Sequence, residues 1–143
     1  MSLTDRDTIK AAAEIDNLHV LKEFIVAHAR KAGFEEKPCG QIELAVDELL
    51  TNVISYAYPE EPGSVTVRCV TNSDGDLFIQ IADSGIPFDP LRKRAPDFGT
   101  SIENSKIGGL GIHLARQMLD EMKYARKGDL NILTVCKKRG EKS

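Results

Sequence analysis

The longest regular pattern in this sequence lies between residues 38 and 56, where apolar side chains recur at helical spacing. Pro38 stands at the start of this segment, and Pro59 and Pro62 follow its end near Tyr56. A helix with one apolar face needs a second apolar layer to pack against. The positions that form this face follow the i, i+3, i+4, i+7 pattern and are Ile42, Ala45, Val46, Leu49, Leu50 and Val53.

The residues after this helix alternate between apolar and polar side chains, which is the pattern of a half-buried strand. Val65, Val67 and Cys69 are the apolar positions of one strand, and residues 77–82 read as a second strand. Residues 72–75, between them, are rich in Asn, Asp and Gly and predict a tight turn. This part of the chain should therefore form an antiparallel hairpin.

The remaining patterns predict a strand and a helix before the helix at 38–56, and a further helix and hairpin after the first hairpin. Gly33 should end the first helix. Because the strands pair as hairpins and the helices are grouped, the sequence predicts an α+β two-layer sandwich, with a mixed, mostly antiparallel sheet covered on one face by about three helices. The additional elements expected are a strand at 8–15, a helix from an N-cap at Asn17 to about Ala32, a helix opened by Gly108–Gly111, and strands at 124–126 and 130–136.

Length and charge narrow the class of protein. The 143 residues suit one domain spanning 1–143, and a net charge of −3 argues against nucleic-acid binding. No window is long and apolar enough for a membrane span or a signal peptide, so we expect a cytoplasmic protein.

Cys39, Cys69 and Cys136 include no close pair, which disfavours a disulfide framework or metal cluster; the last two should be buried. The basic run 137–139 should be a solvated tail.

Glu48 and Asn52 form a polar pair on the helix at 38–56. They are four residues apart, so they lie one turn above each other on the same face, at the border of the apolar stripe. A carboxylate without a cationic partner suits general-base work on a hydroxyl or a water, and an amide oxygen can bind Mg²⁺. The alternative is an ordinary pair of surface residues.

Asp83 and Gly85 follow the predicted strand at 77–82 directly. A carboxylate at the end of a strand is a fixed acceptor, and a nearby glycine lets the backbone approach a ligand closely. Such a site can receive a flat ring that carries an amino group, such as adenine. Taken alone, the same residues also fit a plain turn.

Gly108, Gly109 and Gly111 stand at the start of the third predicted helix. A glycine-rich turn at a helix N-terminus points backbone N–H groups at an anion, commonly phosphate. A hinge before a helix is the alternative. The irregular segment before it, about 89–108, has no lasting period and could close over a nucleotide as a lid.

Together these segments resemble the Bergerat-fold ATP-binding superfamily, which includes gyrase and the histidine kinases, and they are most similar to its stand-alone anti-sigma-factor serine/threonine kinases. Residues 42–52 followed by 56–58 resemble the N box of that family. Residues 83–90 resemble its first glycine box, and residues 108–121 resemble its second. The likeness covers about residues 8–138. Two departures are Pro87, where the wider superfamily often has glycine, and Tyr56, where many of the kinases have histidine.

The resemblance implies a role for each matching residue. Glu48 would be the general base and Asn52 the Mg²⁺ ligand. Asp83 would hold the adenine amino group, with Gly85 beside the ring. The positions implied to contact the ATP phosphates through their backbone are Gly109, Leu110 and Gly111, and Thr134 on the last strand would lie near the adenine.

The leading hypothesis is therefore an ATP-dependent kinase that phosphorylates a serine or threonine of an anti-sigma-factor antagonist of the STAS type. The resemblance also implies sequestration of a sigma factor by partner switching, and a homodimer. A second hypothesis is a regulatory module that binds ATP, transfers nothing and controls a partner by nucleotide-dependent docking. A histidine-kinase catalytic domain is disfavoured, because we find no dimerisation helix with a phosphoacceptor histidine.

Overall fold

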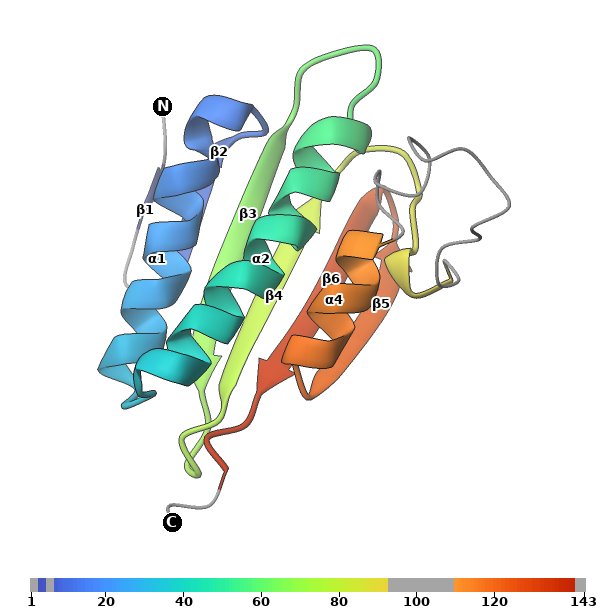
Figure 1. Cartoon of the computed structure of the whole chain (residues 1–143). Helices are drawn as coiled ribbons and strands as arrows, with labels where there is room; N and C mark the ends of the chain where they lie inside the picture. The colour runs from blue at the N-terminus through green and yellow to red at the C-terminus, as the bar shows by residue number, and fades with distance from the viewer. Residues whose placement is uncertain (1–2, 5–6, 93–109, 141–143) are drawn as a thin grey trace.

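The computed structural model describes residues 3, 4, 7–92 and 110–140 (Figure 1). Three helices and six strands make up this part of the chain. Short 3-10 turns lie at Ile15–Asn17 and Pro90–Arg92. The helices are α1 (Leu18–Lys31), α2 (Glu36–Tyr56) and α4 (Leu110–Met118), and the strands are β1 (Leu3–Thr4), β2 (Thr8–Ala12), β3 (Ser64–Thr71), β4 (Leu77–Asp83), β5 (Glu121–Lys127) and β6 (Leu130–Lys137).

The strands form one sheet in the order β1-β2-β3-β4-β6-β5. β3 and β4 form the predicted hairpin, with Val67 opposite Ile81, and β5 and β6 form the second hairpin. β4 pairs with β6, which joins the two hairpins in the middle of the sheet. Every strand pair within the described residues is antiparallel. The predicted sheet is confirmed, and its antiparallel character extends to all of these pairs.

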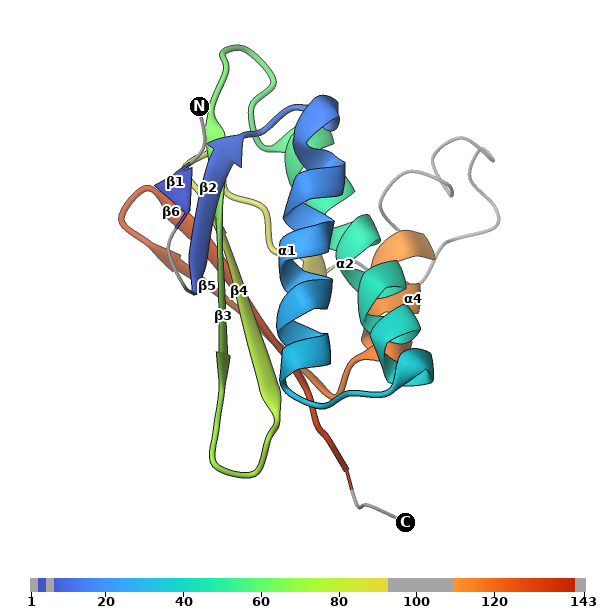
Figure 2. The same ribbon diagram turned by 90° about the vertical axis from the view of Figure 1, so that its left-hand side faces the viewer.

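All three described helices cover the same face of the sheet, as Figure 2 shows from the side. The hydrophobic core lies between these helices and that face. The buried side chains of β4 alternate along the strand, with Leu77, Ile79 and Ile81 facing the helices. The apolar stripe predicted on α2 is buried there as well, and the residues Ile42, Ala45, Val46, Leu49 and Leu50 all belong to this one core. The two-layer α+β prediction is confirmed.

The ends of α1 show one prediction confirmed and one that changes. Gly33 follows the helix with φ of +98°, a conformation that glycine adopts without strain. Asn17 does precede the helix, but its side chain makes no capping hydrogen bond. Its Nδ2 instead donates to the Ala12 carbonyl oxygen at 2.9 Å, so it ties the helix start to the end of β2.

The basic residues at the end of β6 and directly after it are not a simple solvated tail, which corrects the prediction for 137–139. Lys137 Nζ donates to the Met118 carbonyl oxygen at the end of α4, at 2.6 Å. Arg139 Nη1 donates to the Ala32 carbonyl oxygen at the end of α1, at 2.8 Å. Cations at helix C-termini satisfy free carbonyls and oppose the helix dipole. The chain end therefore fastens two helices to the sheet.

Searching the described residues for a helix with the length and apolarity needed to cross a membrane finds none.

Replacing Arg139 with alanine should lower the free energy of unfolding by about 1–2 kcal/mol, because the last carbonyls of α1 lose a charged donor. Urea unfolding followed by circular dichroism measures this change. Lys138→Ala is the matched control, since the Lys138 side chain is 55% exposed and makes only a long ion pair with Glu121. Equal losses in the two variants would contradict the capping role.

The three cysteines are free and buried, as expected for Cys69 and Cys136. Burial, and secondarily the Asp7 carboxylate, raises the pKa of the Cys69 thiol to about 12. In the unfolded chain the thiol pKa is the ordinary 9.0. Below this pH the thiol is protonated in both states and its full contribution to folding stability is present. As the pH rises toward 12 the thiol ionises in the unfolded chain first, so that contribution to stability is lost. At pH of about 9, iodoacetamide should label Cys69 in urea and leave it unlabelled in buffer, as read by peptide mass spectrometry. Rapid labelling in buffer would contradict the burial.

Candidate functional site

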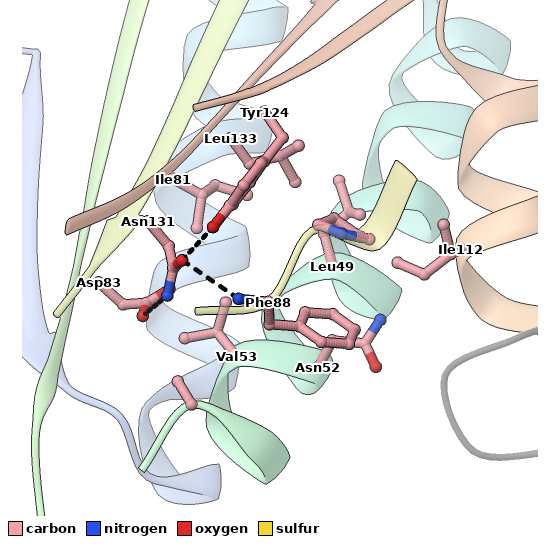
Figure 3. A pocket seen from close by; sticks show the side chains of 12 residues that line it. Leu49, Asn52, Val53, Ile81, Asp83, Phe88, Ile112, Tyr124, Asn131 and Leu133 are labelled. Atoms are coloured by element: carbon pink, nitrogen blue, oxygen red, sulfur yellow. Dashed lines mark hydrogen bonds between the residues drawn. The ribbon is translucent and has the colours of Figure 1, made fainter. Parts of the chain in front are cut away.

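A cavity lies between α2, the start of α4 and the helix-facing side of β4, β5 and β6 (Figure 3). Most of its wall is apolar, and four side chains bring polar groups to it. Two of these, Asn52 and Asp83, are residues that the sequence selected from separate elements. The lining residues are Leu49, Asn52, Val53, Ala57, Ile81, Asp83, Phe88, Pro90, Ile112, Tyr124, Asn131 and Leu133.

Asp83 reaches the cavity because it continues the inward row of β4 by one step beyond Ile81. The side chain is 7% exposed. Its Oδ1 accepts hydrogen bonds from the Gly85 backbone N–H and from Asn131 Nδ2, each at 2.9 Å. Within the described residues, the other oxygen, Oδ2, accepts no hydrogen bond. Asp83 therefore brings an oriented, unused acceptor to an apolar wall.

Asn52 brings an unsatisfied amide to the same cavity. The residue is 8% exposed on α2, and Nδ2 is buried without a hydrogen-bond partner in the described part of the chain. Leaving such a group unpaired costs about 1–3 kcal/mol, and most buried polar groups are paired. A ligand in the cavity would supply the missing partner.

Glu48 lies one turn before Asn52 on α2 and is half-buried. Its carboxylate has no hydrogen-bond or ion-pair partner among residues 3, 4, 7–92 and 110–140. Glu48 itself does not line the cavity, although its neighbour Leu49 does. It is thus an unpaired base beside the cavity and on the same side of the helix as Asn52.

Gly85 is required by packing within the chain. A Cβ at this position would lie 2.1 Å from the carbonyl oxygen of Ala57, at the end of α2. The next residue, Ile86, donates its N–H to that same oxygen at 2.9 Å. Gly85 is not among the residues that line the cavity. The close approach that we expected toward a ligand is therefore made to α2 in this structure.

Thr134 lies on the wrong face of the sheet to reach the cavity, which corrects its predicted position. It is opposite Gln80 in the β4–β6 pair, and Gln80 Nε2 contacts Thr134 Oγ1 at 3.5 Å on the face without helices. Side chains of a strand alternate between faces, so the inward residues of β6 are Asn131 and Leu133. A shift of one residue reverses the face.

The glycine-rich segment is only partly described. Gly108 and Gly109 lie outside the described residues, as does the predicted lid beyond Arg92. Leu110 and Gly111 are the first residues of α4, so a helix does open where the sequence predicts one. Ile112, in the first turn, lines the cavity. The N-terminus of α4 is therefore at the site.

Sequence reasoning missed Asn131, Tyr124 and Phe88. Asn131 is the clearest case, because it is 5% exposed and occupies an inward position of β6 in phase with Leu133 and Val135. A polar residue in the buried phase of a strand is an unusual feature that the alternation could have revealed. Tyr124 and Phe88 show no comparable irregularity in the sequence, since aromatic side chains at these positions are typical of a hydrophobic core.

The enclosed space is about 40 Å³, which is much less than a ligand pocket of about 300 Å³ or more. Phe88 lies in this space, on the segment between β4 and the 3-10 turn at Pro90–Arg92 (Figure 3). Side-chain rotation at a binding site is common on ligand entry. A ligand the size of a nucleobase would therefore need the cavity to widen.

The sequence matches the family model described as "Histidine kinase-like ATPase domain" over residues 11–137. Serine-protein kinase RsbW of Listeria monocytogenes is 28% identical over 139 residues, which cover 93% of this chain and 88% of the relative. Serine/threonine-protein kinase BtrW of Bordetella bronchiseptica is 28% identical over 95 residues, 66% of each chain.

Solved structures agree on the fold. The histidine kinase domain of the Erythrobacter litoralis EL346 blue-light activated histidine kinase superposes with a TM-score of 0.54 at 22% identity. The match covers 85% of this chain and 60% of that one, so this chain spans less than two thirds of the solved domain. At this identity the likeness concerns the fold alone.

Gly85→Ala should destabilise the protein by about 1–3 kcal/mol, because the added methyl group meets the backbone of Ala57. Gly40→Ala is the control, since an added Cβ there meets no atom within 4 Å and alanine favours the helix by about 0.5–1 kcal/mol. Thermal unfolding of both variants measures the difference. A Gly85 variant as stable as the Gly40 variant would contradict the packing explanation.

Proposed function

The chain belongs to the histidine kinase-like ATPase domain family, and we propose that it is an ATP-dependent serine/threonine protein kinase. The single observation that carries the proposal is that one cavity is lined both by Asp83, with its unused Oδ2, and by Asn52, with its unsatisfied Nδ2. Relatives named as serine-protein kinases match 93% of the chain, which supports transfer of phosphate to a protein hydroxyl.

We assign the adenine end of the site to Asp83. Its free carboxylate oxygen would accept the exocyclic amino group of adenine, and the apolar side chains of Ile81 and Leu133 would border the ring. Guanine presents a carbonyl oxygen in place of that amino group, so two acceptors would face each other. A buried polar group left unpaired in this way gives strong discrimination between ligands. The site should therefore prefer ATP to GTP.

We assign the phosphate end to Asn52, Glu48 and the start of α4. The Asn52 oxygen makes no hydrogen bond within the described residues and so suits a Mg²⁺ ligand, while the unpaired Nδ2 would donate to a phosphate oxygen. Bound together with the phosphates, Mg²⁺ would neutralise charge on the transferring group. The backbone of Gly109, Leu110 and Gly111 would hold phosphate oxygens at the helix N-terminus, with residues 89–108 as a lid over the nucleotide.

Glu48 is the proposed general base. Its carboxylate would accept the proton of the target hydroxyl as that oxygen attacks the γ-phosphorus of ATP. The new bond joins the hydroxyl oxygen to phosphorus, the bond from the γ-phosphorus to the bridging oxygen breaks, and ADP leaves. Within the described residues, the Glu48 carboxylate makes no ion pair or hydrogen bond that would hold it away from the target hydroxyl.

The proposed protein substrate is an anti-sigma-factor antagonist of the STAS type, and a sigma factor is the proposed second partner. The support is the likeness to relatives named RsbW over most of both chains. We further propose that residues 1–143 act as one domain in the cytoplasm, as a homodimer.

A non-catalytic ATP-binding module is the second candidate, and one observation favours it. Glu48 borders the cavity but does not line it, so the nucleotide could bind without a base in contact with the reacting atoms. Such a module would regulate a partner by docking in a nucleotide-dependent way. ATP binding is common to both candidates, and only phosphate transfer separates them.

Glu48→Gln should lower transfer of labelled phosphate from ATP to the antagonist protein by about 100-fold or more, with ATP affinity retained. The substitution keeps the size of the side chain and removes the base. Glu43→Gln is the control, because Glu43 is an exposed glutamate on the same helix. Transfer is read by gel autoradiography and affinity by calorimetry.

Three outcomes would count against parts of the proposal. Tight ATP binding without transfer to any antagonist protein would support the binding module. Equal phosphate transfer by wild type and Glu48→Gln would show that Glu48 is not the general base. In Asp83→Asn and in Asn52→Ala we expect ATP affinity to fall by at least about tenfold. Unchanged ATP affinity in both variants would show that this cavity is not the ATP site.

A further inference from the structure

We propose that Asn131 is a positioning residue that orients the Asp83 carboxylate and so sets the selectivity of the cavity for an amino-bearing purine. The proposal rests on the proposed function of Asp83 as the adenine acceptor. Asn131 acts through Asp83, and neither the family match nor the sequence motifs single it out. The argument starts from its hydrogen bonds.

The amide nitrogen of Asn131 has both of its hydrogens in use. Nδ2 donates to Asp83 Oδ1 at 2.9 Å and to the Ile86 carbonyl oxygen at 2.8 Å. One side chain therefore links the end of β4 to the segment that follows it. The Asp83 oxygen that it binds is also the one that accepts the Gly85 N–H, so a single carboxylate oxygen carries both protein contacts.

The amide oxygen of Asn131 is surrounded by donors. It accepts from the Phe88 N–H at 3.3 Å, from Arg126 Nη1 at 3.2 Å and from the Tyr124 hydroxyl group. Three donors on one end fix which end of the amide is oxygen, so the other end must present its hydrogens to Asp83. Figure 3 shows Asn131 between Asp83 and Tyr124, with its hydrogen bonds to Asp83, Tyr124 and Phe88 drawn as dashed lines.

This arrangement decides which Asp83 oxygen meets a ligand. With Oδ1 held by Asn131 and Gly85, the carboxylate cannot rotate without breaking these hydrogen bonds, and Oδ2 is left unused on a side chain that lines the cavity. Asn131 is 5% exposed, so water does not replace it readily. Without Asn131 the carboxylate would lose its fixed orientation, and the amino group of a purine would lose most of its advantage.

The positioning role of Asn131 is tested by selectivity for the amino group. Loss of a residue with a merely structural role would weaken the binding of all purine triphosphates equally. The probes are ATP and purine riboside triphosphate, which lacks the amino group. Asn131→Asp keeps the shape of the side chain and replaces the donors with acceptors beside Asp83. We expect the ratio of the two affinities, measured by calorimetry at pH of about 8, to fall about tenfold or more.

Asn72→Asp is the matched control. Asn72 also donates from Nδ2 to an aspartate, Asp76, at 3.2 Å, but it lies in the exposed turn between β3 and β4, far along the strand from the cavity. The same chemical change beside the same type of partner should leave the ratio as in wild type. A fall in this control equal to that in Asn131→Asp would overturn the proposal.

The pH dependence gives a second readout. The charged and titratable groups facing position 131 are Asp83 from β4 and Tyr124 and Arg126 from β5. In Asn131→Asp two carboxyl groups face each other, so one should bind a proton more readily than usual. At pH of about 5.5 that proton would restore a donor to Asp83, and ATP affinity relative to wild type should recover. A flat relative profile would contradict the proposal.

Tyr124→Phe provides a second test of the role of Asn131 in case Asn131→Asp fails to fold. It removes one hydroxyl donor to the Asn131 oxygen and should lower the ratio by a few-fold. An unchanged ratio in a folded Tyr124→Phe variant would overturn the proposal. The proposed function fails separately: if wild type binds both triphosphates equally, Asp83 is not an adenine acceptor.

Discussion

Burial of the apolar face of α2 against the inner face of the sheet is the constraint on which the rest of the structure depends. Leu49 and Leu50 of α2 and Ile79 and Ile81 of β4 belong to one core. Each element carries a polar residue one step of its repeat after these side chains. On α2 that step after Leu49 places Asn52, and on β4 the step after Ile81 places Asp83. The cavity forms where both polar residues lie at the edge of the core, so the packing that stabilises the fold also positions them.

The predictable features follow from this periodicity, and the missed ones do not. Helical spacing predicted α2, and alternation predicted β4, at whose end Asp83 stands, because both patterns repeat over several residues. Thr134 was assigned from the family resemblance, and an error of one residue in matching a strand turns a side chain to the other face. The reason for Gly85 lies in Ala57, which is distant in sequence, and no local pattern reveals such a contact.

The segment from Gly85 to Phe88 connects the two halves of the site. Its start is held by the end of α2, through the close approach of Gly85 to Ala57 and the hydrogen bond from Ile86 N–H. Its other contacts are to Asn131 on β6, through the Ile86 carbonyl and the Phe88 N–H. The backbone is fixed at both ends of this segment, while the Phe88 side chain lies in the cavity.

Two buried asparagines at this site differ in their hydrogen bonding, and the difference indicates different roles. Asn131 uses both amide hydrogens and accepts from three donors, so it is complete without a ligand. Asn52 is buried to a similar degree, yet its Nδ2 has no partner within the described residues. A completed network rigidifies its surroundings, whereas an unpaired buried amide costs free energy until something binds it. The fold thus holds the Asp83 carboxylate through Asn131 and leaves the Asn52 amide unpaired within the described residues, as the proposed function requires of the two ends of the site.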